Sequence, residues 1–206
     1  MNRRCVIATP SVREFADAVF EEEEDPATKS FFSEIISSIS DVRFSHDGRY
    51  IMSRDYLTLK VWDVNMESRP LATIPIHDYL RPKLCDLYEN DCIFDKFEGN
   101  WGPTGSTVLT GSYSNYFHLI DWERDSSVVL QADKSAFKSK KLASMNKGPS
   151  RTAASAGGIG TVNPNNIDFN KKILHASYHP REETIAIAAT NNLFIFSANN
   201  PSGMPA

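Results

Sequence analysis

Apolar and polar positions alternate along the chain in short runs, and turn-forming residues separate these runs. Between Asp41 and Asp63 the apolar runs are divided by His46–Gly48 and again by Arg54–Asp55. Glycine tolerates the positive φ of a tight turn, and aspartate also favours turns. The pattern therefore predicts a unit of three successive strands at residues 41–44, 50–52 and 57–62.

Two further units of the same kind follow along the chain. The second is predicted to begin with a strand at Cys92–Phe97, to turn at 99–105, and to continue with strands at 107–110 and 115–121. The third is predicted to have strands at 173–178, 184–188 and 193–196, with turns at 179–180 and 191–192. Period-2 runs bounded by Gly, Pro and Asn are typical of antiparallel sheet.

The first unit closes on Val61-Trp62-Asp63, an ending typical of WD40 repeats. We therefore expect an all-β fold, a WD40 β-propeller represented by about three blades. The blade-ending residues Asp63, Asp121 and Ser197 are farther apart than the roughly 40–45 residues of a plain repeat. Three blades do not close a ring and leave open strand edges. The expectation is thus a part of a larger propeller.

Segments between the blades give weaker signals. Ser30–Ile39 has apolar residues at helical spacing, but its β-branched content also allows a strand. Leu71–Ile76 resembles a short edge strand with Pro75 near its end. Residues 77–91 are predicted to be a short helix or helical loop, because Leu84, Leu87 and Tyr88 share one face. Residues 131–166 are predicted to be a flexible insertion and 197–206 a disordered tail.

Composition and charge narrow the functional classes. The 206 residues carry a net charge of −4, which does not suggest nucleic acid or a membrane surface as a partner. No apolar stretch approaches the roughly 18 residues that span a bilayer. Three cysteines form no disulfide framework, so we expect a cytoplasmic and possible nuclear protein. An acidic run at 21–25 and a basic tract at 134–151 are interpreted mainly as solvated loops.

Nothing in the chain predicts a metal, a cofactor or an enzyme. The five histidines lack metal-ligand spacing, and Cys85 and Cys92 are too far apart for a zinc knuckle. No Ser/His/Asp set occurs in a nucleophile context, and no pair of carboxylates suggests acid–base catalysis.

Several long stretches closely resemble the B-type (55-kDa) regulatory subunit of protein phosphatase 2A. They are Phe31–Asp41, Asp55–Leu57, Lys83–Phe97, Asp168–His175 and Asn191–Phe196. The resemblance covers residues 20–196, whereas residues 1–19 do not match. It implies the C-terminal half of a seven-bladed propeller about twice this length. The resemblance does not include the N-terminal blades of that family or the hairpin arm with which the family grips the scaffold subunit.

The resemblance also implies a substrate-binding groove on one face of the propeller. Carried over motif by motif, its residues here are Phe31, Phe32, Ile35, Ser38, Cys85, Tyr88, Asp91 and Phe94. Aromatic side chains beside carboxylates suit a partner with an apolar anchor and basic flanks. The alternative is structural, with Phe94 and Ile35 in the core and Tyr88 a packing residue.

The resemblance implies a non-catalytic subunit that recruits phosphoprotein substrates to a phosphatase 2A holoenzyme and sets its specificity. Its partners would be the scaffold (A) subunit, the catalytic (C) subunit and the substrates. Two alternatives are a generic WD40 interaction scaffold and a truncated paralogue that acts as a decoy without assembling.

Overall fold

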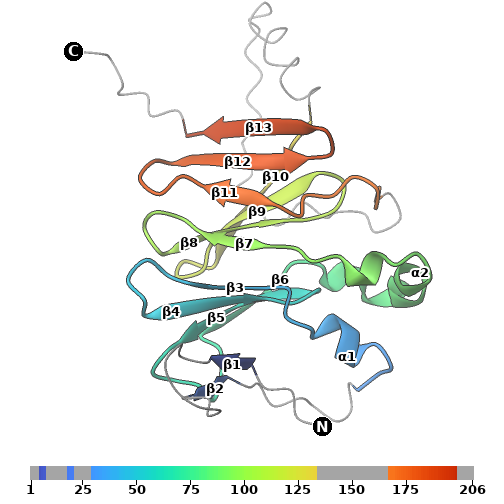
Figure 1. Ribbon diagram of the computed structural model, residues 1–206, viewed down its shortest axis with the longest axis horizontal. Coiled ribbons are helices and arrows are strands. Elements are labelled where there is room, and N and C mark those ends of the chain that lie inside the picture. The colour runs from blue at the N-terminus through green and yellow to red at the C-terminus, as the bar shows by residue number, and fades with distance from the viewer. Residues whose placement is uncertain (1–4, 8–17, 21–28, 134–166, 199–206) are drawn as a thin grey trace, which may run out of the picture. The chain divides into compact units, whose positions relative to one another are not determined.

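The computed structural model describes residues 5–7, 18–20, 29–133 and 167–198. The chain divides into two compact units, Met1–Gly99 and Asn100–Ala206, which are taken one at a time below. Strands dominate both units, and Figure 1 labels the strands and the two α-helices. The predicted acidic run, basic tract and tail lie outside the described residues, apart from Ser197 and Ala198. So do most of residues 1–19 and of the predicted insertion.

The first unit contains a four-stranded sheet whose third strand ends on Trp62–Asp63. Its strands are β3 (Asp41–Phe44), β4 (Tyr50–Arg54), β5 (Thr58–Asp63) and β6 (Ala72–Pro75), antiparallel and in sequence order. Gly48 has φ 72°, as the predicted turn requires. The predicted blade and its edge strand are confirmed, and Pro75 is the last residue of β6.

A short hairpin packs against this sheet through Phe20. Strands β1 (Cys5–Ile7) and β2 (Ala18–Phe20) pair antiparallel. Phe20 forms a small buried cluster with Ile51 and Trp62, and its ring meets that of Trp62 edge-on at 5.7 Å. The indole Nε1 of Trp62 donates to Ser53 Oγ at 2.9 Å, so the buried N–H is satisfied.

A buried arginine joins the sheet to the segment that follows it. Arg54, at the end of β4, is fully buried and donates to the carbonyl oxygens of Asp55 and Thr58. Its guanidinium lies 5.7 Å from the centre of the Phe97 ring, a cation–π contact. His77 is also fully buried, and its Nδ1 lies 3.3 Å from Arg54 Nη2. Arg54, His77 and Phe97 therefore fix where the chain runs between residues 77 and 97.

The helical elements of the first unit are short. They are α1 (Ser33–Ile36), η2 (Asp78–Lys83), α2 (Leu84–Glu89) and η3 (Cys92–Phe94). The ambiguous segment at 30–39 thus contains one turn of helix, and the helical prediction for 77–91 is confirmed.

The strand predicted at Cys92–Phe97 is wrong. Asp91 adopts a left-handed conformation with φ 58°, and the N–H groups of Phe94 and Asp95 then bond three residues back to Asp91 and Cys92. These bonds close a 3-10 turn with Ile93 buried. The apolar residues of this stretch therefore lie in and just after a 3-10 turn, and the next strand begins only at Gly99.

The second unit begins with a four-stranded antiparallel sheet. Its strands, in spatial order, are β10 (Ser126–Gln131), β9 (Tyr116–Asp121), β8 (Thr107–Gly111) and β7 (Gly99–Trp101). The strands predicted at 107–110 and 115–121 are confirmed. Strand β10 was not predicted, although Val128, Val129 and Leu130 give it an apolar character.

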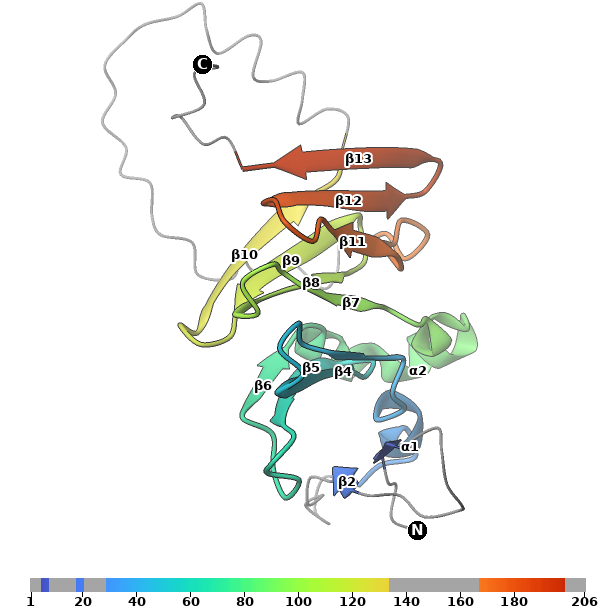
Figure 2. The ribbon, with the colours of Figure 1, turned by 60° about the vertical axis from the view of Figure 1, so that its left-hand side comes forward.

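The third sheet, also in the second unit, has three strands among the described residues. They are β11 (Ala176–Tyr178), β12 (Thr184–Ala189) and β13 (Asn192–Ser197), in that order. Figure 2 shows this sheet beside the β7–β10 sheet, and a buried cluster joins the two. Leu109 and Phe117 pack there with Ile173, Ile185 and Ile187. The third predicted blade is confirmed.

Candidate binding surface

Four aromatic rings from three separate segments of the first unit meet one another. We call Phe31, Phe32, Tyr88 and Phe94 the aromatic cluster. The Tyr88 ring lies 5.8 Å from Phe31, 5.9 Å from Phe32 and 5.8 Å from Phe94, and the two phenylalanines before α1 are 5.2 Å apart. Such edge and tilted arrangements are the favoured geometry of aromatic pairs. Tyr88 is therefore the centre of the cluster.

The cluster is presented to solvent rather than buried. Phe31 is 73% exposed, Phe94 51% and Tyr88 40%. The alternative that Phe94 is a core residue is therefore wrong, and Ile35 is only partly buried. Large exposed apolar side chains that gather in one place are typical of interaction sites.

Buried neighbours in sequence hold the exposed rings in place. Leu84 and Leu87 anchor α2 from within, which leaves Tyr88 on its outer side. Ile93 anchors η3 in the same way and leaves Phe94 outside. At α1, the hydroxyl of Ser33 accepts the N–H of Ser30 at 2.8 Å and so shapes the turn that carries Phe31 and Phe32.

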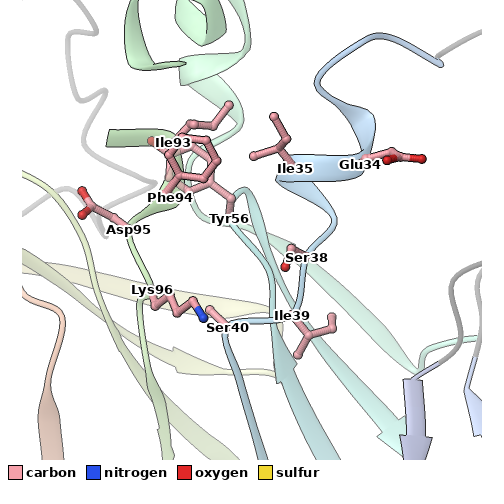
Figure 3. Close-up of a pocket in the computed structure, with 10 residues that line it drawn as sticks. All are labelled: Glu34, Ile35, Ser38, Ile39, Ser40, Tyr56, Ile93, Phe94, Asp95 and Lys96. Atoms are coloured by element: carbon pink, nitrogen blue, oxygen red, sulfur yellow. The ribbon is translucent and has the colours of Figure 1, made fainter. Parts of the chain in front are cut away.

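A pocket of about 460 Å³ adjoins the cluster at Phe94. Figure 3 shows its lining side chains, with Ile35 directed toward Phe94 and Glu34 directed away. The lining comes from α1 and the residues after it, from Tyr56, and from η3 and the residues after it. The residues are Glu34, Ile35, Ser38, Ile39, Ser40, Tyr56, Ile93, Phe94, Asp95 and Lys96. A pocket of this size accommodates a few side chains of a partner segment.

Of the predicted site residues, the structure brings most together. Phe31, Phe32, Tyr88 and Phe94 form the cluster, and Ile35 and Ser38 line the adjoining pocket with Phe94. Cys85 and Asp91 line neither, although both are exposed on the same helical segment. Whether these residues bind a substrate stays a prediction.

Acidic side chains outnumber basic ones in the segment from α2 to the residues after η3. Exposed carboxylates stand at Asp86 and Glu89 on α2 and at Asp91 before η3, and Asp95 lines the pocket. Lys96 also lines the pocket and was missed as a site residue, as were Tyr56 and Ile39. The repeated aromatic and acidic residues of 84–97 drew the prediction, whereas these three carry no distinctive pattern of their own.

The described residues contain no group of three or more His, Cys, Asp or Glu side chains that could hold a metal ion. None of their helices is long and apolar enough to cross a membrane.

Antiparallel sheets of three and four strands, with strand β5 of one sheet ending on Trp62–Asp63, define a protein built from WD40-type β-propeller blades. A comparison with protein-family profiles found no match. Curated relatives are more informative. The chain is 56% identical to the B regulatory subunit of protein phosphatase PP2A from Schizosaccharomyces pombe, over 87% of this chain and 42% of the relative.

Two further relatives carry similar descriptions. The beta isoform of the 55 kDa B regulatory subunit of serine/threonine-protein phosphatase 2A from Carassius auratus is 52% identical over 94% of this chain and 43% of its own length. The phosphatase 2A regulatory subunit phr2AB of Dictyostelium discoideum is 53% identical over 87% of this chain and 38% of its own. The chain therefore belongs to the family of 55-kDa B-type regulatory subunits of protein phosphatase 2A.

The chain spans about two fifths of the length of these relatives and matches their C-terminal part. All three are named regulatory rather than catalytic subunits, which supports the expectation that this chain is not an enzyme.

Proposed function

We propose that the chain acts as a non-catalytic regulatory subunit of a phosphatase 2A complex, together with a scaffold (A) and a catalytic (C) subunit. The carrying observation is the identity of 52–56% to proteins named as regulatory subunits of this phosphatase. Dephosphorylation would then be performed by the catalytic chain, and this chain would determine which phosphoproteins reach it.

The aromatic cluster and its pocket are the surface proposed to recruit those phosphoproteins. Interfaces depend on a few large anchors, and exposed Tyr and Phe side chains that are already ordered lose little entropy on binding. An apolar side chain of the partner would enter the pocket beside Phe94, and another would stack on Tyr88. Tethering a substrate in this way raises the effective concentration of its phosphorylated residue at the catalytic metals.

The charges near the cluster favour partner segments with basic flanks. Residues 84–96 contain four carboxylates, Asp86, Glu89, Asp91 and Asp95, and one lysine, Lys96, a net charge of −3 from −4 and +1. Complementary charge speeds encounter and sets specificity more than it adds affinity. We therefore propose that apolar anchors provide most of the affinity and that the carboxylates select among partners.

A retention experiment tests the role in the complex. The 206-residue chain, immobilised, is incubated with the purified scaffold–catalytic dimer, and a full-length relative serves as the matched control. Retention of the dimer and of a phosphoprotein substrate would support the regulatory role. Retention of the substrate without the dimer would instead favour the decoy alternative.

If the chain retained neither the dimer nor the substrate, while the full-length control retained both, the proposal for this chain would be contradicted. A generic WD40 scaffold would be favoured if other partners bound and neither phosphatase subunit did.

A further inference from the structure

The pocket beside Phe94 has two walls that are far apart in the sequence (Figure 3). Residues 34, 35 and 38–40 line one side, which we call the α1 wall, and residues 93–96 line the other, which we call the η3 wall. Residues 92–97 form no strand of the β3–β6 sheet, so no strand ladder holds the η3 wall beside the α1 wall. The spacing of the two walls must therefore be set by other contacts.

Ser40 ties the two walls together. It is the last residue of the α1 wall, and its hydroxyl donates at 2.7 Å to the carbonyl oxygen of Phe97, directly after the η3 wall. The same hydroxyl lies 3.1 Å from the carbonyl oxygen of Arg54, to which the N–H of Ser40 also donates at 2.7 Å. Arg54 and Phe97 are both fully buried. Ser40 is thus anchored at the core and reaches across to the η3 wall.

A second tie follows at the next residue. The carboxylate of Asp41 accepts the N–H of Gly99 at 3.0 Å. Asp41 also forms an ion pair with Arg43 at 3.0 Å, and Arg43 in turn lies 3.7 Å from the carboxylate of Glu98. The α1 wall and the start of β3 are therefore joined to residues 97–99, which directly follow the η3 wall.

We infer that Ser40 is a positioning residue of the proposed recruitment surface, an inference that rests on the function proposed above. Its bond to Phe97 holds the walls at the spacing that receives an apolar side chain of a partner. A site whose supporting contacts let it loosen by about 1 Å loses much of its function. Ser40 acts through the position of Phe94 on the η3 wall.

Amide hydrogen exchange of the free chain tests the positioning without a partner. Ser40→Ala removes the hydroxyl, and the N–H groups of the η3 wall and of Gly99 should then exchange about threefold faster or more. Exchange in β12 and β13 of the second unit should stay unchanged. Ser37→Ala is the matched control, because the Ser37 hydroxyl donates at 2.6 Å to Ser33 within the α1 turn and not across the pocket.

Binding of a probe tests the consequence for recruitment. The probe is a fluorescent peptide with adjacent Leu and Phe side chains between lysine flanks, which is the partner chemistry proposed above. Ser40→Ala should raise its dissociation constant about three- to tenfold, because one supporting hydrogen bond is lost. Ser37→Ala should leave the constant unchanged. Ser40→Thr keeps a hydroxyl and should bind as the parent chain does.

A double-mutant cycle with Phe94→Ala separates positioning from stability. Without the Phe94 ring, Ser40→Ala should change the dissociation constant little further. A loss that came only from a less stable chain would be equally large in both backgrounds. Calorimetry shows whether each variant is folded. Asp41→Ala, which removes the tie to Gly99, is a second variant with the same expected pattern.

The outcomes distinguish this inference from the proposed function. Unchanged exchange of the η3 wall in Ser40→Ala would overturn the inference. So would additive losses in the cycle, or a Ser40→Ala chain that binds the probe as tightly as the parent. Faster exchange in Ser40→Ala, with a parent chain that does not bind the probe, would confirm that Ser40 positions the walls and would contradict the proposed recruitment instead.

Discussion

The ring of Tyr88 lies 5.8 Å from the ring of Phe94, yet both side chains remain exposed to solvent. Tyr88 comes from α2 and Phe94 from η3, and each follows a buried residue that anchors its own helix. The pair is therefore held in place by neighbours whose packing does not depend on the two rings. Function and stability should consequently be separable at these positions.

The double substitution Tyr88→Ala with Phe94→Ala should weaken capture of a phosphoprotein substrate by about tenfold or more, because two anchors are lost. The thermal midpoint should change little, since exposed side chains contribute little to the core. Binding is measured by surface plasmon resonance and stability by calorimetry. Phe97→Ala is the contrasting variant, because the fully buried Phe97 should cost about 3–5 kcal/mol of unfolding free energy. Parallel losses of binding and stability in the double variant would mark the pair as core.

Asp91 combines a charge near the cluster with a left-handed backbone, φ 58°. Asparagine also accepts this conformation, so Asp91→Asn should keep the fold and weaken binding of a peptide with basic flanks by a few-fold, at low salt only. Asp91→Val should instead lower the unfolding free energy by about 1–2 kcal/mol. Peptide titrations at two salt concentrations, with urea unfolding of both variants, separate the two roles. A salt-independent effect of Asp91→Asn would argue against the electrostatic role.

Two carboxylates at the turns of the first blade should make the free energy of unfolding depend on pH in the acid range. The pKa of Asp47 is lowered mainly by the hydrogen bond from the Ser45 hydroxyl and further by the backbone N–H of Arg49. The pKa of Asp63 is lowered mainly by the hydrogen bond from the backbone N–H of Asn65 and further by the guanidinium of Arg49. Folded carboxyls with lowered pKa values bind fewer protons than unfolded ones, so this stability is present above the ordinary pKa of 3.8 and is lost as pH falls below it.

Asp47→Asn removes one of these groups while an amide oxygen can still accept the Ser45 hydroxyl. The thermal midpoint of this variant should therefore fall less steeply than that of the parent chain as the pH falls below about 4. An unchanged acid slope would show that Asp47 is not one of the groups responsible.

Gly111 lies where no side chain fits. A Cβ at this position would stand 1.9 Å from the carbonyl oxygen of Ile173, which is backbone and cannot yield cheaply. Gly111→Ala should lower the unfolding free energy by about 3 kcal/mol or more. Gly102→Ala, whose Cβ would meet Thr107 Cβ at 3.0 Å, should cost less. Urea unfolding of both variants measures the difference, and equal costs would contradict the assigned contact.

The period-2 pattern predicted those strands that alternate clearly and are bounded by turn residues, such as β4, β5, β12 and β13. It failed at Cys92–Phe97, because the left-handed Asp91 redirects the chain into a 3-10 turn, and such a local conformation leaves no periodic signal. It also missed β10, whose partner β9 lies beyond a turn at Asp125, another left-handed residue.

The candidate site was only partly predictable. The residues of the aromatic cluster followed from the family resemblance, but their exposure and mutual contacts did not. Tyr56 and Lys96 line the pocket because the chain returns to it from Asp55–Leu57 and from the residues after η3. Single residues brought together by tertiary folding show no spacing in sequence.

The turn at Ser114–Asn115 binds the chain on both sides of residues 134–166. Before them, Ala132 N donates to the carbonyl of Asn115 at 2.8 Å. After them, Asp168 N donates to Ser114 Oγ at 2.9 Å. The chain therefore passes the Ser114–Asn115 turn both before and after residues 134–166. The entropy cost of joining two such points grows only slowly with the number of residues between them. The sequence between these two hydrogen bonds is therefore a suitable insertion point. A fluorescent domain or an affinity tag inserted there should leave both sheets of the second unit unchanged.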